Sequence, residues 1–136
     1  MTFVMDTSIT AAWCIPDEAT PTTDLLLNRL REESAVVPVI WPLEITNVLL
    51  TAERRGRVMP AEIAPVFAFL ADLPITIDTD GLSHAFQSVP ALGRAHQLTS
   101  YDAAYLELAM RSGLPLATLD DDLARAANAV GVPLLI

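Results

Sequence analysis

Lysine is absent from this chain, and all eight of its cationic side chains are arginines. Asp and Glu together number 17, so the formal net charge is −9 at pH 7. Contacts with nucleic-acid phosphates depend on Lys and Arg, and a protein this acidic is therefore a poor general binder of polyanions. Any nucleic-acid substrate would need local positive charge.

Cysteine occurs only once, at Cys14, which excludes an internal disulfide. We expect Cys14 to be a small buried hydrophobic residue in a protein of the reducing cytoplasm. No uncharged run approaches the roughly 18 residues that a membrane span requires. The first residues also lack the basic start and apolar segment of a signal peptide. The expectation is a cytoplasmic protein that does not associate with membranes.

Hydrophobic residues, by contrast, are abundant. They make up 52% of the 136 residues and give a mean hydropathy of +0.41, which is high for a soluble chain of this length. The length predicts a single domain over residues 1–136. The apolar excess predicts either a very dry core or a surface that a partner covers.

Short apolar segments alternate along the chain with helical ones. The predicted strands are Thr2–Met5, Ala35–Val39, Ile75–Ile77, Leu114–Thr118 and Pro133–Ile136. The predicted helices run from Pro21 to about Glu33 after a Thr20 cap, from Pro42 to near Gly56, from Pro60 to Leu73 with a kink at Pro65, through one or two segments broken near Pro90, from a Ser100 cap to Gly113, and from Asp121 to Val130. This alternation predicts an α/β fold of three layers, α/β/α, with a central, mainly parallel sheet.

Four carboxylates stand out because their neighbours are apolar. Asp6 and Asp120 follow predicted strands, whereas Glu44 and Asp102 lie in the first turns of predicted helices. In a parallel sheet all four positions fall at the carboxyl edge, where ligands bind. An isolated carboxylate among apolar neighbours is costly unless it is paired, hydrogen-bonded or bound to a cation. Four oxygen ligands at one edge indicate a site for Mg²⁺ or Mn²⁺.

Structural roles are the alternative for each acid taken singly. Asp6 and Asp120 also fit helix N-caps, and Glu44 and Asp102 also favour the dipoles of their helices. The occurrence of all four at one edge favours the metal site. In "LDDDL", Asp121 and Asp122 are interpreted as first-turn helix charges, and which of the three acids points inward stays open.

The segments "VMDTSI", "PLEITNVL", "TSYDAAYLELA" and "LATLDDDLARAANAVGV" resemble those of PIN-domain ribonucleases. Within that family, the likeness is to the VapC toxins of bacterial toxin–antitoxin pairs, and it spans Asp6 to Val132. The resemblance implies a PIN-like fold whose acidic, metal-binding and catalytic residues are Asp6, Glu44, Asp102 and Asp120. It implies polar helpers at Thr7 or Ser8, Asn47 and Thr118.

The activity that this resemblance implies is hydrolysis of RNA phosphodiester bonds with Mg²⁺, for which Mn²⁺ substitutes. It also implies a small antitoxin partner and a homodimer. Apolar residues such as Phe67 on the predicted helix from Pro60, and Trp13 near the first strand, are candidate contacts for that antitoxin or for a second copy of the chain.

Positive charge near the site is expected from Arg54, Arg55 and Arg57 in "AERRGR", which are the candidate RNA contacts. The same arginines also fit a helix C-terminus, where cations favour the dipole. His84 and His96 lie outside the acidic motifs and are interpreted as structural or surface residues.

The sequence is also compatible with three other functions. The first is a haloacid-dehalogenase-like phosphatase with Asp6 as the nucleophile. The second is an acidic adaptor that does not cut, and the third is a PIN nuclease for housekeeping RNA processing.

Overall fold

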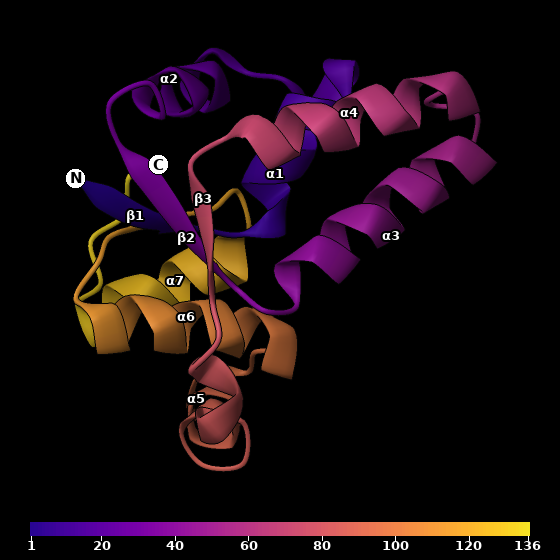
Figure 1. Ribbon diagram of the computed structural model, residues 1–136. Helices are drawn as coiled ribbons and strands as arrows, with labels where there is room; N and C mark the ends of the chain where they lie inside the picture. Colours follow the sequence, from indigo (N-terminus) through magenta and orange to yellow (C-terminus); the bar gives the residue numbers. More distant parts are fainter.

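The computed structural model describes all 136 residues, and in it a parallel sheet separates two groups of helices (Figure 1). The four strands are β1 (Thr2–Met5), β2 (Ser34–Pro38), β3 (Ile75–Asp78) and β4 (Leu116–Ala117). Their order is β3-β2-β1-β4, and every neighbouring pair is parallel. The predicted three-layer α/β fold with a parallel sheet is confirmed.

Seven α-helices and two short 3-10 helices connect the strands. They are α1 (Thr7–Cys14), η1 (Pro16–Glu18), α2 (Pro21–Arg29), α3 (Trp41–Arg54), α4 (Pro60–Asp72), η2 (Gly81–His84), α5 (Ser88–His96), α6 (Ser100–Ser112) and α7 (Asp121–Val130). Helices α1 and α2 lie on one side of the sheet and α6 and α7 on the other, while α3 and α4 form a hairpin that extends beyond the sheet (Figure 1). None of the helices has the length and apolar character needed to cross a bilayer.

Helix α1 was not among the predicted helices. Its sequence, TSITAAWC, contains three β-branched residues and a serine, which are weak helix formers. It forms because the Asp6 side chain accepts a hydrogen bond from the backbone N–H of Ser8 and so caps the first turn. Burial of Ile9, Ala12 and Cys14 against the rest of the core then holds the helix in place.

Several predicted boundaries were wrong by a few residues. Helix α2 ends at Arg29 rather than near Glu33, and the cap of α6 is Thr99, whose hydroxyl accepts a hydrogen bond from the Asp102 N–H. The last segment is not a strand, since Leu134 makes only an isolated bridge to Leu116 of the two-residue strand β4. Pro65 lies inside α4, which continues to Asp72.

The core is one cluster of 27 buried residues that includes all three of Phe3, Val4 and Met5 in β1. Burying a large apolar side chain contributes about 1.5–3 kcal/mol, so β1 is among the most strongly anchored segments of the chain. Cys14 belongs to this cluster, and burial raises the pKa of its thiol to about 11. The prediction that Cys14 is a buried hydrophobic residue is confirmed.

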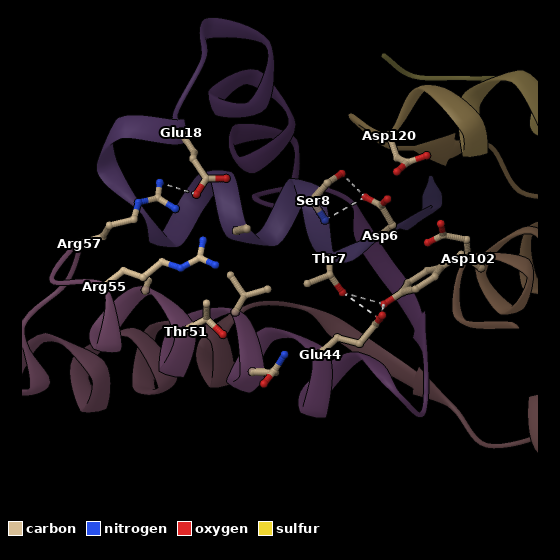
Figure 2. Close-up of a pocket in the computed structure, with 15 residues that line it drawn as sticks. Asp6, Thr7, Ser8, Glu18, Glu44, Thr51, Arg55, Arg57, Asp102 and Asp120 are labelled. Atoms are coloured by element: carbon tan, nitrogen blue, oxygen red, sulfur yellow. Dashed lines mark hydrogen bonds and ion pairs between the residues drawn. The ribbon is translucent and has the colours of Figure 1, made fainter. Parts of the chain in front are cut away.

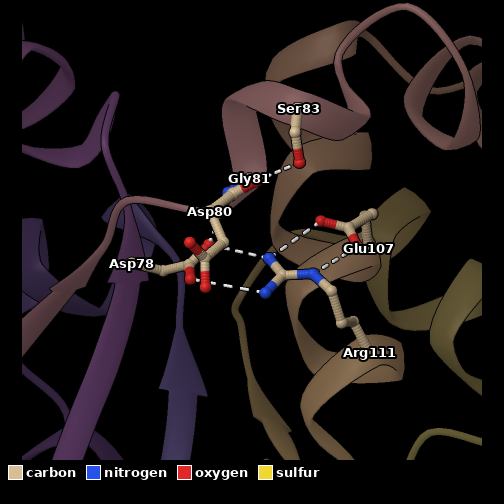
Figure 3. Close-up of polar contacts among 6 residues, drawn as sticks. All are labelled: Asp78, Asp80, Gly81, Ser83, Glu107 and Arg111. Carbon is tan, nitrogen blue, oxygen red and sulfur yellow. Dashed lines mark hydrogen bonds and ion pairs between the residues drawn. The ribbon is translucent and has the colours of Figure 1, made fainter.

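An ion-pair network ties α6 to the far end of β3 (Figure 3). The Arg111 guanidinium contacts Asp78 at 2.7 Å and Glu107 at 2.8 Å. This pairing lowers the pKa of Asp78 and compensates the charge of Glu107, which is only 5% exposed. Arg111 therefore has a structural role at the end of β3, which lies two strands away from β1 in the sheet.

Candidate functional site

A cavity of about 530 Å³ opens at the carboxyl edge of the sheet, and all four predicted acids line it (Figure 2). Asp6 follows β1, and Asp120 comes shortly after β4. Glu44 lies in the first turn of α3 and Asp102 in the first turn of α6. The parallel order of the strands therefore brings together four acids that are up to 114 residues apart, as residue numbers 6 and 120 show.

Asp6 is the most deeply placed of the four, with 4% of its surface exposed. Its Oδ1 accepts hydrogen bonds from the Ser8 N–H at 3.1 Å and the Ser8 hydroxyl at 2.5 Å. The hydroxyl of buried Thr118 donates to Oδ2 at 2.6 Å. Burial nevertheless outweighs these bonds and raises the pKa of Asp6 above its usual value. The side chain is fixed in one orientation by three donors.

Glu44 is held by two hydroxyl groups from other elements. Tyr105 of α6 donates to Glu44 Oε1 at 2.5 Å, and the Thr7 hydroxyl of α1 lies 3.0 Å from the same oxygen (Figure 2). Burial and the bond to Glu44 raise the pKa of Tyr105, which keeps the phenol protonated as a donor. Only Oε1 is engaged, so Oε2 is the oxygen of Glu44 that can meet a ligand.

Asp102 is the acid whose environment is least compensated. Its carboxylate has no hydrogen-bond or ionic partner, since only its backbone N–H is engaged. Partial burial, together with the negative charges of Asp120, Asp6 and Glu44, raises its pKa to about 6. Repulsion of this kind shows that the four acids share one electrostatic environment.

The structure also shows which of the three acids in "LDDDL" belongs to the cavity. Asp120 lines the cavity and caps α7 by accepting a bond from the Leu123 N–H at 2.9 Å. Asp121 and Asp122 do not line it, and Asp122 pairs with Arg125 at 2.7 Å. The single Asp120 side chain therefore serves both as helix cap and as part of the site.

The predicted polar helpers are placed at two depths. Thr7, Ser8 and Asn47 line the cavity, while Thr118 lies behind Asp6 and supports it. Of the predicted arginines, Arg55 and Arg57 line the cavity and Arg54 does not. Because Arg54 and Arg55 are adjacent on a helix end, their side chains diverge by about 100°. His84 and His96 lie outside the cavity, as expected.

Three lining residues with polar side chains were missed from the sequence: Tyr105, Thr51 and Glu18. Tyr105 lies three residues after Asp102 on the same helix, so its position on the same face is a signal that could have identified it. Thr51 follows Glu44 by seven residues, which is two helical turns. Glu18 pairs with Arg57 at 2.9 Å across 39 residues, and no local pattern predicts such a contact.

The residues fit a divalent cation by the chemistry of their donors. None of the four acids has a cationic partner among the ion pairs of the protein, and oxygen ligands of this kind bind Mg²⁺ and Mn²⁺. Their side chains, as placed, do not form a group of three at the spacing of a metal centre. Glu44, Asp102 and Asp120 each keep at least one carboxylate oxygen without a hydrogen bond, and these side chains are able to adjust toward a cation.

Comparison with known proteins identifies the family. The model of the PIN domain matches residues 3–129. This chain belongs to the PIN-domain family. It is 28% identical to "Ribonuclease VapC3" of Pyrobaculum aerophilum over 133 residues, which is 98% of this chain and all of that protein. It is 33% identical to "Ribonuclease VapC3" of Mycobacterium tuberculosis over 106 residues, covering 76% of this chain and 74% of that one.

Solved structures agree with this assignment at the level of the fold. PAE2754 from Pyrobaculum aerophilum superposes with a TM-score of 0.67 at 23% identity, over 93% of this chain and 87% of that chain. VapBC2 from Rickettsia felis, solved with a DNA fragment from its promoter, also gives a TM-score of 0.67, at 14% identity and over 98% and 97% of the two chains. The PIN-like fold expected from the sequence motifs is confirmed.

Replacing Tyr105 with phenylalanine should lower the free energy of unfolding by about 1–2 kcal/mol, because the ring packing is kept while a bond to a charged acceptor is lost. Tyr101→Phe is the matched control, since Tyr101 is in the same helix and is 59% exposed. Urea denaturation of both variants measures the difference. Equal stability of the two variants would show that the Tyr105 hydroxyl does not anchor Glu44.

Proposed function

We propose that this protein is a metal-dependent ribonuclease and the toxin of a bacterial toxin–antitoxin pair. The observation that carries the proposal is the cavity in which Asp6, Glu44, Asp102 and Asp120 meet without a cationic partner. Membership of the PIN-domain family and the likeness to proteins named Ribonuclease VapC3 support the activity. The substrate bond is the RNA phosphodiester.

In this mechanism the four acids would hold Mg²⁺, with Mn²⁺ as a substitute. The cation would supply Lewis acidity toward a phosphoryl oxygen and lower the pKa of water. The chain's own residues provide the orientation. Ser8 and Thr118 fix Asp6, and Tyr105 and Thr7 hold Glu44 by Oε1 and leave Oε2 without a hydrogen bond. Preorganised ligands of this kind reduce the reorganisation needed when the reaction begins.

The phosphatase alternative is disfavoured by the surroundings of Asp6. A nucleophilic carboxylate needs an accessible oxygen, whereas both oxygens of Asp6 accept hydrogen bonds and the residue is 4% exposed. A carboxylate that three donors hold in one orientation agrees better with a fixed cation ligand than with a nucleophile. A non-cutting adaptor would have no need to gather four acids in one cavity, where burial and the charges of the other three raise the pKa of Asp102.

The test is cleavage of labelled total RNA by the purified protein, with Mg²⁺ or Mn²⁺ and with EDTA. We expect discrete fragments with either metal and none with EDTA. Cleavage that persists in EDTA, or intact RNA with both metals in a folded preparation, would overturn the proposal.

The antitoxin partner is proposed to dock on an apolar groove between α3, α4 and β3. Its volume is about 280 Å³, and eight of its ten lining residues are hydrophobic. Phe67 lines this groove and is 37% exposed, and Ile77 at the edge strand is 41% exposed. An apolar helix or strand from a small partner would cover such a surface. The likeness in fold to VapBC2 from Rickettsia felis and to FitAcB from Neisseria gonorrhoeae (TM-score 0.51, 18% identity, covering 98% of this chain and 96% of that chain) supports an antitoxin partner.

Trp13, the other partner contact predicted from the sequence, has surroundings that favour a structural role. The Trp13 side chain is only partly exposed, packs against the core and donates its indole N–H to the Thr23 carbonyl at 2.7 Å. Trp13 therefore fixes α1 against α2. A charge at this position would disturb folding rather than report on binding.

Phe67→Asp should weaken co-purification with the product of the neighbouring small open reading frame, while RNA cleavage persists. Phe69→Asp is the control, because Phe69 is in the same helix and 39% exposed but does not line the groove. Size measurement of each free variant shows whether the proposed homodimer uses the same face. Normal partner retention by folded Phe67→Asp would exclude this groove as the antitoxin site.

A further inference from the structure

One face of α3 carries a polar track along the cavity. Its members are Glu44, Asn47, Thr51 and Arg55, at spacings of three, four and four residues, and all of them line the cavity. Residues at these spacings lie above one another on one side of a helix. The track therefore runs from the acidic end of the cavity to an arginine at the C-terminal end of α3 (Figure 2).

The two arginines at the far end differ in their engagement. Arg57 contacts Asp17 at 3.1 Å and Glu18 at 2.9 Å, so its charge is offset by two carboxylates. Arg55 makes no ion pair and no side-chain hydrogen bond, and it is exposed within the lining. It is the only cation lining the cavity without a partner. In a chain of net charge −9, this uncompensated guanidinium in a cavity lined by acids is available to an anionic ligand.

The geometry along α3 places this charge well away from the acids. Eleven residues separate Glu44 from Arg55, which corresponds to about 16 Å along the helix axis at about 1.5 Å per residue. A ligand that contacts both ends must be extended and must carry an anionic group remote from the group at the acids. A single-stranded nucleic acid has this form, because its phosphates repeat along the chain.

We propose that Arg55 forms a phosphate subsite for the RNA strand, remote from the phosphate that is cut, with Asn47 and Thr51 contacting the nucleotides between. This inference rests on the proposed ribonuclease function. It gives the direction of the bound RNA strand, which runs from the four acids toward the C-terminal end of α3. The lining favours RNA over a peptide tail, since only four of its 15 residues are hydrophobic and it offers no aromatic anchor apart from buried Tyr105. The planar guanidinium of Arg55 can donate two parallel hydrogen bonds to the oxygens of one phosphate.

The test measures binding and cleavage of a labelled ten-nucleotide RNA. In Mg²⁺, Arg55→Ala should raise KM roughly tenfold and leave kcat within about twofold, because the contact is made equally in ground and transition states. In EDTA, fluorescence anisotropy over a salt series should show weaker binding and a slope of log K against log salt that is smaller by about 0.7. Arg55→Lys should restore the slope but only part of the affinity, since lysine lacks the paired donors.

Arg31→Ala is the matched control, because Arg31 is exposed, has no ionic partner and lies outside the cavity. Wild-type KM, affinity and salt slope in Arg55→Ala would overturn the subsite while leaving the ribonuclease function intact. Loss of antitoxin retention by Arg55→Ala with unchanged RNA binding would also overturn it, and would assign Arg55 to a partner carboxylate. Failure of wild type to bind or cut RNA would instead reject the proposed function itself.

Discussion

Asp6→Asn is expected to lower the rate of metal-dependent RNA cleavage by at least about a hundredfold. Loss of a residue that only supports a metal ligand costs about 10- to 100-fold, and loss of the charge of a ligand itself should cost more. The substitution keeps the size of the side chain and its place at the start of α1. Asparagine is also an acceptable helix cap, so the bond to the Ser8 N–H can be retained. The initial rate of cleavage at saturating Mg²⁺ gives the result.

The control for this experiment is Asp121→Asn, which removes a carboxylate next to Asp120 but outside the cavity. Its activity should equal that of wild type. Thermal unfolding of the Asp6 variant establishes that the fold is intact. A folded Asp6→Asn protein that cuts RNA at the wild-type rate would remove Asp6 from the proposed metal site.

The sequence was sufficient to predict the four acids at one edge, and the reason is topological. Asp6 and Asp120 each follow a strand, and parallel neighbours bring such positions together whatever their separation in sequence. Burial on both faces made β1 recognisable as a short apolar run. The strand predicted at Pro133–Ile136 does not form. Its neighbour β4 is only two residues long, so that only one isolated bridge joins the two segments.

Features that depend on tertiary contacts could not be predicted in this way. Helix α1 has weak intrinsic propensity and is stabilised by a cap and by burial. The bond between Tyr105 and Glu44 joins residues 61 apart, and the ion pairs of Arg57 join η1 to the loop after α3. Only these ion pairs show that Arg57 is engaged and that Arg55 is free for a ligand. No pattern in the sequence distinguishes Arg55 from Arg57 in this respect.

Asp102→Asn is expected to raise the stability of the metal-free protein by about 1–2 kcal/mol at pH 7.5, after allowance for solvent screening of a partly exposed group. Burial and the charges of Asp120, Asp6 and Glu44 raise the pKa of Asp102 to about 6. At pH 7.5 the carboxylate is ionised in both states, and its charge costs more free energy in the folded protein than in the unfolded chain. Removing the charge relieves the repulsion, and thermal unfolding in EDTA measures the gain.

The pH dependence of this gain has a definite sign. Because the folded-state pKa lies above the ordinary value of 3.8, the stabilisation from the Asp102 proton is complete below about pH 4 and is lost as the pH rises through about 6. The advantage of Asp102→Asn over wild type should therefore be largest above pH 7 and disappear near pH 4. Unfolding curves at intervals between these limits test this trend.

Added Mg²⁺ should reverse the order of the two proteins. A cation bound only by the folded state stabilises by about 2.7 kcal/mol at 100 times its Kd, and loss of a ligand lowers the occupancy of the variant. Asp24→Asn is the matched control, since Asp24 also lies in the first turn of a helix but far from the cavity, and the contribution of the helix dipole is thereby subtracted. Equal stabilisation of wild type and Asp102→Asn by Mg²⁺ would exclude Asp102 as a ligand. If Asp102→Asn without metal is no more stable than wild type, the four carboxylates do not repel one another as their positions indicate.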